Sequence, residues 1–509
     1  MIRVETKVRL PFLWGKAVFR KEIWSEINLI VGPNGSGKTL LAQGIAQDFE
    51  KNGIDVTFIR SERVERDDLY AELAKDQKVR TCIEEVLSNM FGKEIRFEET
   101  ENGVVPVVVN KNWGVEYNLK DGECHGLKEI ISLLVSLYSC KTRCLILDEP
   151  ELHLHPQFQL FFMNEIRRVS EENPDRIFFL ITHSPFFLDL RFSEDLIGVV
   201  VCHINKMPTF VESLSDEDKT LLWRFLPRFN TYHKQFFFSD NQIFVEGYTD
   251  QQMFTNLLNC LENKHKAAGT GIIDVGGKDE LGVFFKVCSL LGTDGRIITD
   301  LDSLFAGKLR DVICADERPQ IWLDKQLEKQ MPFYRMLFTK RELLVPVCLE
   351  KLIRRLELFL NAIGNFVCEI NYSISPEIDL FVMKVQEIRA KHESTGGMDT
   401  FRTVILQGVI QLNTELGDIL PVPLALTIPL IRNLFSMILA ATETAKVYIL
   451  PDGCIEHYYR ENEVKYMPVS AKDRLFHNEL DYLNIATQEQ IKERYRGLLD
   501  ILQRACSRD

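Results

Sequence analysis

The stretch GPNGSGKT, residues Gly32–Thr39, decides the fold of the first half of the chain. It fits the pattern Gly-x4-Gly-Lys-Ser/Thr, follows an apolar strand predicted at residues 26–31 and precedes helical spacing at residues 40–49. In such a P-loop the backbone N–H groups surround nucleotide phosphates, and the helix N-terminus favours their negative charge. We therefore predict an α/β nucleotide-binding domain. Its phosphate loop contains Asn34, Gly35 and Gly37, with Lys38 on the β- and γ-phosphates and Thr39 on Mg²⁺.

Two further apolar strands are followed by polar residues that suit the hydrolysis of a nucleoside triphosphate. Asp148 ends the strand at residues 144–147, where its carboxylate can face the phosphate loop and hold Mg²⁺. The adjacent Glu149 is placed to activate the attacking water. His183 follows the strand at residues 177–181 and can contact the γ-phosphate as a switch. These residues predict that the ligand is a nucleoside triphosphate, and we expect it to be ATP.

The second half of the chain places carboxylates at other predicted strand ends. Glu246 follows the strand at residues 242–245, and Asp250 lies at the start of the next helix. Asp300 and Asp302 follow the strand at residues 296–298. Hard oxygen ligands of this kind suit Mg²⁺ or Mn²⁺, and two such ions can position a phosphodiester and activate water. Either pair alone is a weak signal, but together, at equivalent strand ends, they predict a metal centre.

Length and composition limit the class of protein. A chain of 509 residues is too long for a single core, and 45% apolar with 27% charged residues is typical of a globular protein. The sequence has no apolar run of about eighteen residues, no signal-peptide pattern and no CxxC pair, so we expect a cytoplasmic protein without a membrane span. The net charge of −13 excludes a generally basic nucleic-acid coat, so any phosphate-binding surface must be local.

The patterning divides the chain into four parts. We expect the ATPase domain at residues 1–235, the first part of a second α/β domain at 236–305, a helical insertion at 306–440, and the rest of the second domain with C-terminal helices at 441–509. Residues 94–119 alternate and carry turn signals, which predicts hairpins. Residues 215–235 are polar and aromatic and indicate a linker, whereas residues 343–362 have a long helical period.

Several of these motifs resemble those of known families. Residues 148–156 (DEPELHLHP), followed by Thr182-His183-Ser184-Pro185, resemble the ABC-type ATPase heads of the OLD (overcoming lysogenisation defect) family. Residues 246–250 (EGYTD), the Gly276-Gly277-Lys278 turn and Asp300-Leu301-Asp302 resemble the Toprim fold of topoisomerases, primases and OLD nucleases. The resemblance implies an ABC-type P-loop ATPase head followed by a Toprim domain. It covers most of residues 1–305 and 440–480, whereas no motif marks the helical insertion.

The resemblance also implies further site residues. ABC-type heads dimerise, and each completes the other's site with a Leu-Ser-x-Gly loop. Its best match here is residues 119–123 (LKDGE), where Lys120 replaces the serine, which favours ATP as a switch over ATP as a motor. Arg63 resembles a residue of the family's segment near the nucleotide. In the Toprim part, Glu456 is expected as a further metal ligand, and Lys472 is expected to stabilise the pentacovalent phosphate.

The implied function is that of an ATP-regulated DNA endonuclease that depends on Mg²⁺ or Mn²⁺, forms a dimer or higher oligomer through its ATPase heads, and takes part in anti-phage defence. Members of the family act alone, with a helicase, or beside a retron reverse transcriptase and its DNA, and nothing in the chain selects among these. An alternative is an ATP-gated nucleic-acid sensor with an inactive or partner-dependent Toprim site, and the departure at Lys120 keeps this alternative open. A topoisomerase or primase is disfavoured, because the sequence offers no convincing tyrosine nucleophile and no zinc-ribbon cysteines.

Overall fold

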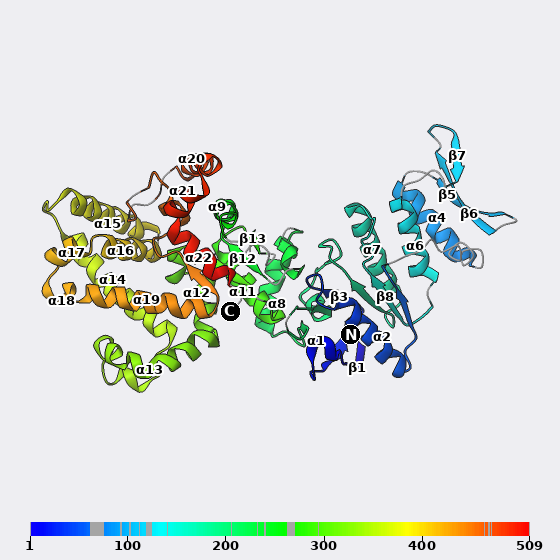
Figure 1. The fold of residues 1–509 in the computed structure, drawn as a ribbon, viewed down its shortest axis with the longest axis horizontal. Helices are drawn as coiled ribbons and strands as arrows, with labels where there is room; N and C mark the ends of the chain where they lie inside the picture. The colour runs from blue at the N-terminus through cyan, green and yellow to red at the C-terminus, as the bar shows by residue number, and fades with distance from the viewer. Residues whose placement is uncertain are drawn as a thin grey trace. The chain divides into compact units, whose positions relative to one another are not determined.

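The chain folds into two compact units, each with its own parallel β-sheet (Figure 1). The first comprises Met1–Asp240 with Leu290–Thr293, and the second comprises Asn241–Ser289 with Asp294–Asp509. The computed structural model describes residues 2–507, except for residues 62–75, 92–93, 101–102, 111, 119–124, 140, 205, 232, 239–240, 262–269, 294, 396, 463, 467–468 and 470. The parallel sheets confirm the predicted α/β fold class.

The first unit is built on a six-stranded sheet with the strand order β11-β10-β3-β9-β8-β4. Its strands are β3 (Ile27–Val31), β4 (Val56–Ile59), β8 (Cys144–Asp148), β9 (Ile177–Ile181), β10 (Val199–Val201) and β11 (Thr209–Phe210). All neighbours are parallel except β10 and β11, which pair antiparallel. Strands β8 and β9 are buried along their whole length, which explains why their sequences are continuously apolar rather than alternating.

Helices and a hairpin cover this sheet. The helices of the sheet domain are α1 (Pro11–Trp14), α2 (Lys38–Lys51), α6 (His125–Ser139) and α7 (Pro156–Glu172). Strands β1 (Ile2–Val8) and β2 (Phe19–Trp24) form an antiparallel pair that packs on α2. In the core beneath them, the rings of Trp24, Phe49 and Phe179 meet edge to face, with centroids 5.0–6.1 Å apart. Because Phe49 lies in the last turn of α2, this packing fixes the end of α2 relative to the sheet.

The alternating segment after β4 forms the predicted hairpins. Strands β5 (Glu94–Thr100), β6 (Gly103–Asn110) and β7 (Val115–Asn118) make a separate antiparallel sheet. Helix α4 (Gln77–Phe91) packs on β5, and Glu84 accepts a hydrogen bond from the backbone N–H of Phe97 at 2.8 Å. The prediction of hairpins at residues 94–119 is therefore confirmed.

The expected linker at residues 215–235 is wrong. The segment contains the helix α8 (Asp216–Phe225) and the 3-10 helices η2 (Leu226–Arg228) and η3 (His233–Phe238). Ser215 caps α8 by accepting the backbone N–H of Asp218 at 3.1 Å. The ring of Phe229 packs against those of Phe225, Phe236 and Phe237. The segment is therefore folded and packed rather than a linker, and it belongs to the first unit.

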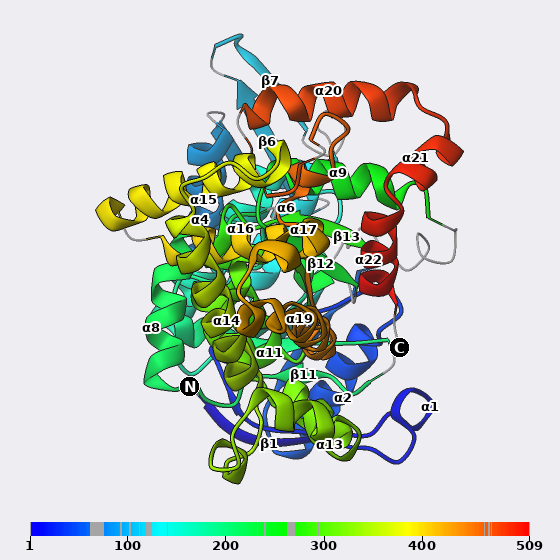
Figure 2. The same cartoon turned by 90° about the vertical axis from the view of Figure 1, so that its left-hand side faces the viewer.

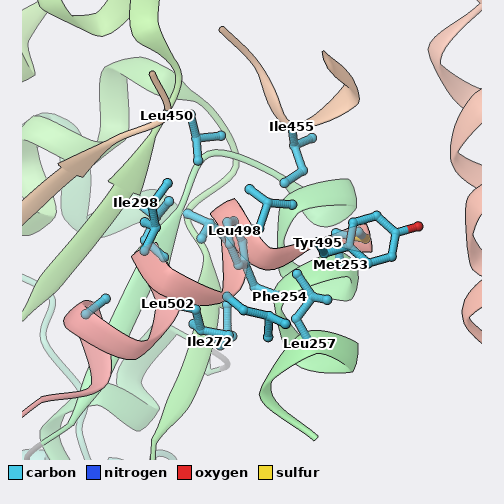
Figure 3. Packing of buried hydrophobic residues seen from close by; sticks show 14 of the residues in the cluster. Met253, Phe254, Leu257, Ile272, Ile298, Leu450, Ile455, Tyr495, Leu498 and Leu502 are labelled. Atoms are coloured by element: carbon cyan, nitrogen blue, oxygen red, sulfur yellow. The ribbon is translucent and has the colours of Figure 1, made fainter. Parts of the chain in front are cut away.

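The second unit centres on a four-stranded parallel sheet with the order β13-β12-β14-β15. Its strands are β12 (Gln242–Val245), β13 (Gly271–Asp274), β14 (Arg296–Thr299) and β15 (Val447–Ile449). Around them lie the helices α9 (Tyr248–Leu258), α11 (Lys278–Leu291), η4 (Leu301–Leu304), η6 (Ile455–Tyr458), α20 (Lys472–Ile485), α21 (Gln488–Arg494) and α22 (Arg496–Cys506). Figure 3 shows side chains of α9 and α22, among them Phe254, Leu498 and Leu502, packed together beside Ile272 and Ile298 of the sheet.

Between β14 and β15 the chain forms a group of helices (Figure 2). They are α12 (Lys308–Ala315), α13 (Glu317–Leu337), η5 (Glu342–Leu344), α14 (Leu349–Glu369), α15 (Pro376–Thr395), α16 (Met398–Gln411), α17 (Asn413–Ile419), α18 (Val422–Ala425) and α19 (Thr427–Thr444). The helix expected from residue 343 begins only at Leu349, because Pro346 disfavours a helical conformation at the residue before it.

One helical stretch among the described residues, Val422–Thr444, is long and apolar enough to cross a membrane by length and composition, a stretch that the sequence patterning did not single out. Helix α19, which makes up most of it, packs against α13, α14 and β15. Ile431, Leu434 and Ile438 of this helix are fully buried. These contacts give its apolar side chains a place in the core of the second unit.

Candidate nucleotide and metal sites

The phosphate loop joins β3 to α2 with the geometry that its glycines predict. Gly32, Gly35 and Gly37 have φ angles of 138°, 79° and 83°, which side-chain-bearing residues rarely adopt. At Gly32 a Cβ atom would lie 2.2 Å from the carbonyl oxygen of Cys202, so only glycine fits there. Asn34 lies in the same turn. The loop ends at Lys38, the first residue of α2, so it opens onto a helix N-terminus.

Lys38, Thr39 and Asp148 lie together at the end of the phosphate loop. The Lys38 Nζ atom donates to the carbonyl oxygens of Gly32 at 3.1 Å and Pro33 at 3.0 Å. Burial lowers the pKa of Lys38, although nearby carboxylates oppose the shift. The Thr39 hydroxyl donates to the Asp148 carboxylate, with both oxygens at 3.2 Å. The structure therefore brings three predicted ATP-site residues into one cluster.

Glu149 and His183 extend this cluster from the ends of β8 and β9. The backbone N–H of Glu149 donates to the Ile181 carbonyl oxygen at 2.9 Å, and Glu149 has a φ of 48°. Its Oε1 atom lies 3.9 Å from Nε2 of His183. Burial, aided by the charge of Lys38, lowers the pKa of His183 to about 4. At pH 7 His183 is thus neutral when no phosphate is bound, and its ring nitrogens can form hydrogen bonds to a phosphate.

Glu151 has a position that the sequence did not single out. Its carboxylate accepts the backbone N–H of His183 at 2.6 Å, which holds the turn after β9 against the turn after β8. Burial raises the pKa of Glu151. Glu151 follows closely on Asp148 and Glu149 in the sequence, which could have indicated a role at the same site. Only the pairing of β8 with β9 shows that its partner is the backbone N–H of His183.

Two residues predicted for the nucleotide site, Arg63 and Lys120, lie outside the described residues. Their roles stay predictions, as does that of the loop at residues 119–123.

His183 gives the first unit a predicted dependence of stability on pH. Because its folded pKa of about 4 lies below the ~6.5 of an unfolded histidine, the unfolded chain binds more protons between these values. We therefore expect this contribution to stability to be lost as the pH falls from about 6.5 to about 4. His183→Asn should reduce the loss, as measured by urea denaturation at pH 7 and pH 4.5. His477→Asn, at an exposed histidine, is the control, and equal losses in both variants would contradict the prediction.

Three of the carboxylates predicted as metal ligands come together at the carboxyl end of the second sheet. Glu246 follows β12 and Asp300 follows β14, and these strands are parallel neighbours, so their carboxyl ends meet. Glu246, Asp300 and Asp302 each offer one carboxylate oxygen, and these atoms lie within 4.8 Å of one another. Asp250 and Glu456, also predicted as ligands, are not part of this set, but their charges help to raise the pKa of Asp300.

Glu246 is held in place by β14 and the turn that follows. Its Oε1 atom accepts hydrogen bonds from the Thr299 hydroxyl at 2.7 Å, the Asp300 backbone N–H at 3.1 Å and the Ser303 hydroxyl at 3.4 Å. The hydroxyl oxygens of Thr299 and Ser303 also lie 2.7 Å from each other. The sequence did not predict these two hydroxyls, because their role depends on how β12 and β14 are aligned.

The electrostatics of the centre fit a divalent cation. Burial, followed by the charges of Glu246, Asp250, Asp302 and Glu456, raises the pKa of Asp300 well above its usual range. Burial and the charges of Glu246 and Glu456 raise the pKa of Asp250 to about 7. Carboxylates that resist ionisation in one another's presence gain most from a bound cation, and the all-oxygen donor set suits Mg²⁺ or Mn²⁺.

Two lysines reach carboxylates of this centre from the first residues of their helices. Lys472 begins α20, and its Nζ lies 2.9 Å from Oε1 of Glu456. Although burial opposes both shifts, this contact raises the pKa of Lys472 and, together with the Cys454 thiol, lowers the pKa of Glu456. Lys278 begins α11, and its Nζ lies 3.0 Å from Oδ1 of Asp302. Lys472 and Glu456 were both predicted as site residues. Asp302 was predicted as a metal ligand, but its ion pair with Lys278 was not predicted.

Two family models match parts of the chain. Residues 237–302 match the family model "Overcoming lysogenization defect protein-like, TOPRIM domain", and residues 63–188 match "AAA ATPase domain". An "OLD nuclease" of Thermus scotoductus is 29% identical over 168 residues. That alignment covers 32% of this chain and 31% of the relative, so the chain spans about a third of the length of the curated relative that it matches.

Solved structures were compared with the chain as well. The SMC head domain from Thermotoga maritima has a TM-score of 0.30 and 13% identity, and the match covers 42% of this chain and 100% of that chain. Stu0660 of Streptococcus thermophilus has a TM-score of 0.29 and 14% identity, with 45% and 86% of the two chains covered.

Proposed function

Because the chain carries an ATPase domain and an OLD-like Toprim domain, as its motifs predicted, we propose that it is an ATP-regulated, divalent-metal-dependent DNA endonuclease. The observation that carries the proposal is the meeting of the Glu246, Asp300 and Asp302 oxygens within 4.8 Å at the edge of the second sheet. The similarity to an OLD nuclease supports a nuclease activity in general.

In the proposed reaction the residues of the chain hold the metal ion in place and stabilise negative charge on the phosphate. Glu246, Asp300 and Asp302, with Asp250 and Glu456 beside them, would hold Mg²⁺ or Mn²⁺. When bound, the ion supplies positive charge to the phosphodiester oxygens and lowers the pKa of water. Three hydrogen bonds orient Glu246 before substrate arrives. The half-exposed side chain of Lys472 offers an ammonium group to the negative charge that develops on the phosphorus oxygens.

We propose that ATP acts as a switch on this activity. Lys38 and Thr39 would bind the phosphates and Mg²⁺, and Glu149 would activate water for slow hydrolysis. Copies of the chain would assemble through their ATPase domains as a dimer or higher oligomer. The setting that we propose is cytoplasmic anti-phage defence, alone, with a helicase partner, or beside a retron reverse transcriptase and its DNA.

Incubation with supercoiled plasmid tests the nuclease proposal. The purified protein is supplied with Mg²⁺ or Mn²⁺, with and without ATP, and nicked or linear product is expected only with metal. RNA is incubated in parallel, because the described carboxylates and lysines act on the phosphodiester and do not distinguish ribose from deoxyribose. Cleavage of RNA alone would correct the substrate. A protein that binds nucleic acid and metal but cuts neither would favour the sensor function.

Glu149→Gln is expected to slow ATP hydrolysis by about 100-fold or more while ATP still binds, because the amide cannot accept the proton of the attacking water. Phosphate release and nucleotide affinity measure the two effects. Glu172→Gln, at an exposed glutamate that ends α7, is the matched control. Hydrolysis at an unchanged rate in Glu149→Gln would remove this residue as the general base.

A further inference from the structure

The loop after β15 is bonded to the metal centre on both sides of Asp300. The backbone N–H of Leu450 donates to the carbonyl oxygen of Thr299 at 2.9 Å. The backbone N–H of Leu301 donates to the carbonyl oxygen of Gly453, also at 2.9 Å. Asp300 lies between Thr299 and Leu301 in the sequence. A displacement of this loop therefore also displaces the Asp300 carboxylate. The same loop continues into Glu456.

The helical insertion contacts this loop at its tightest turn. Gln407 of α16 is 3% exposed, and its Nε2 atom donates to the carbonyl oxygen of Asp452 at 2.6 Å. The next residue, Gly453, has a φ of 127°. A Cβ atom at Gly453 would lie 2.2 Å from Nε2 of Gln407 and 2.5 Å from Nδ1 of His457. The Gln407 amide therefore packs directly on the backbone of the turn.

Helices α15 and α16 also hold the far end of the loop. Gln411, one turn after Gln407, accepts the backbone N–H of Lys465 at 3.0 Å. The hydroxyl of Tyr466 donates to the carbonyl oxygen of Glu377 at 3.3 Å, and its ring packs edge to face on Phe381. Both ends of the segment that carries Glu456 are thus fixed to helices that have no sequence motif.

We infer that the helical insertion positions the metal centre, and that Gln407 is the positioning residue through which it acts. This inference rests on the proposed function and deepens it, because it assigns a role to residues 306–440. Gln407 fixes the turn at Asp452 and Gly453, and the turn fixes Asp300 and Glu456. Residues that orient metal ligands typically change metal affinity by about 10–100-fold when replaced.

Gln407→Met tests this inference, because methionine has a similar length and no donor. Mn²⁺ binding is measured by electron paramagnetic resonance without nucleic acid, and plasmid cleavage is measured over a range of Mn²⁺ concentrations. We expect the Kd for Mn²⁺ to rise about 10-fold, with ATP affinity and the KM for plasmid unchanged. Gln386→Met is the control, because the exposed Gln386 of α15 donates to the Cys368 and Ile370 carbonyl oxygens within the insertion and not to the loop.

A folded Gln407→Met variant that binds Mn²⁺ within twofold of the wild type overturns the inference, as does an equal loss in Gln386→Met. If Gln407→Met does not fold, Gln411→Ala replaces it, because Gln411 is exposed and bonds to the same loop. That variant should weaken Mn²⁺ binding about 3-fold, and unchanged binding overturns the inference. A wild-type protein that binds Mn²⁺ without cutting contradicts only the nuclease proposal, whereas one that binds no Mn²⁺ overturns the metal centre and this inference.

Discussion

Replacing Asp300 with asparagine is expected to lower plasmid cleavage by at least about 100-fold while ATP binding stays at the wild-type level. The Asp300 carboxylate offers an oxygen within 4.8 Å of those of Glu246 and Asp302, and the side-chain amide that replaces it keeps the shape but loses the charge that attracts the metal. Cleavage over a range of metal concentrations measures the effect. Asp311→Asn, at an exposed aspartate of α12, is the matched control and should cut normally.

Removal of metal should also change which of the two proteins is more stable. Asp300→Asn should be more stable than the wild type without metal and less stable with it. Because the folded-state pKa of Asp300 lies above its unfolded-state value, the wild type loses stability as the pH rises above about 4 towards the folded pKa. Asparagine cannot ionise, so Asp300→Asn should unfold at a higher temperature than the wild type at pH 7 in EDTA, and at a lower one in excess Mg²⁺. Full cleavage by Asp300→Asn, or the same order of stability in both buffers, would contradict the metal-site assignment.

Lys38→Ala is expected to weaken ATP binding by about 100-fold or more. The ammonium group of Lys38 is buried beside the phosphate loop, and each charge-assisted hydrogen bond that it forms to a phosphate contributes about 1.5–3 kcal/mol. Calorimetric titration with a slowly hydrolysed ATP analogue measures the loss. Lys51→Ala, at the exposed last residue of the same helix, should bind normally.

This variant also tests regulation. If ATP acts on the nuclease through the phosphate loop, plasmid cleavage by Lys38→Ala should no longer respond to ATP, whichever direction the wild-type response takes. Wild-type affinity for ATP in Lys38→Ala would remove this residue from the site. A retained response of cleavage to ATP, despite lost binding, would place regulation elsewhere in the chain.

The sequence predicted the parts of the two sites that follow apolar strands. Asp148 ends such a strand and Glu246 and Asp300 directly follow one, and the carboxyl ends of parallel strands meet at one edge of a sheet. Thr299 was not predicted, because its hydrogen bond to Glu246 depends on the pairing of β12 with β14 rather than on a local pattern. The helical fold of residues 215–235 was missed because an aromatic cluster buried by packing resembles a polar linker when each residue is taken alone.

The contacts of the insertion were beyond prediction for a related reason. Gln407 and Asp452 are 45 positions apart, and Gln407 belongs to no motif. The helical character of residues 306–440 could be recognised from its period, but a period does not show which helix face meets which loop.

The position of the insertion also determines when the metal centre can form during synthesis. Strands β14 and β15 are hydrogen-bonded neighbours, yet residues 300–446 lie between them. A ribosome must therefore make the whole insertion before β15 can complete the sheet, and Glu456 and Lys472 follow later still. Contacts between residues so distant in the chain form late in folding. A nascent chain thus has its phosphate loop long before the carboxylates of the second unit can come together, so we expect an unfinished copy of the protein to lack the nuclease activity that we propose.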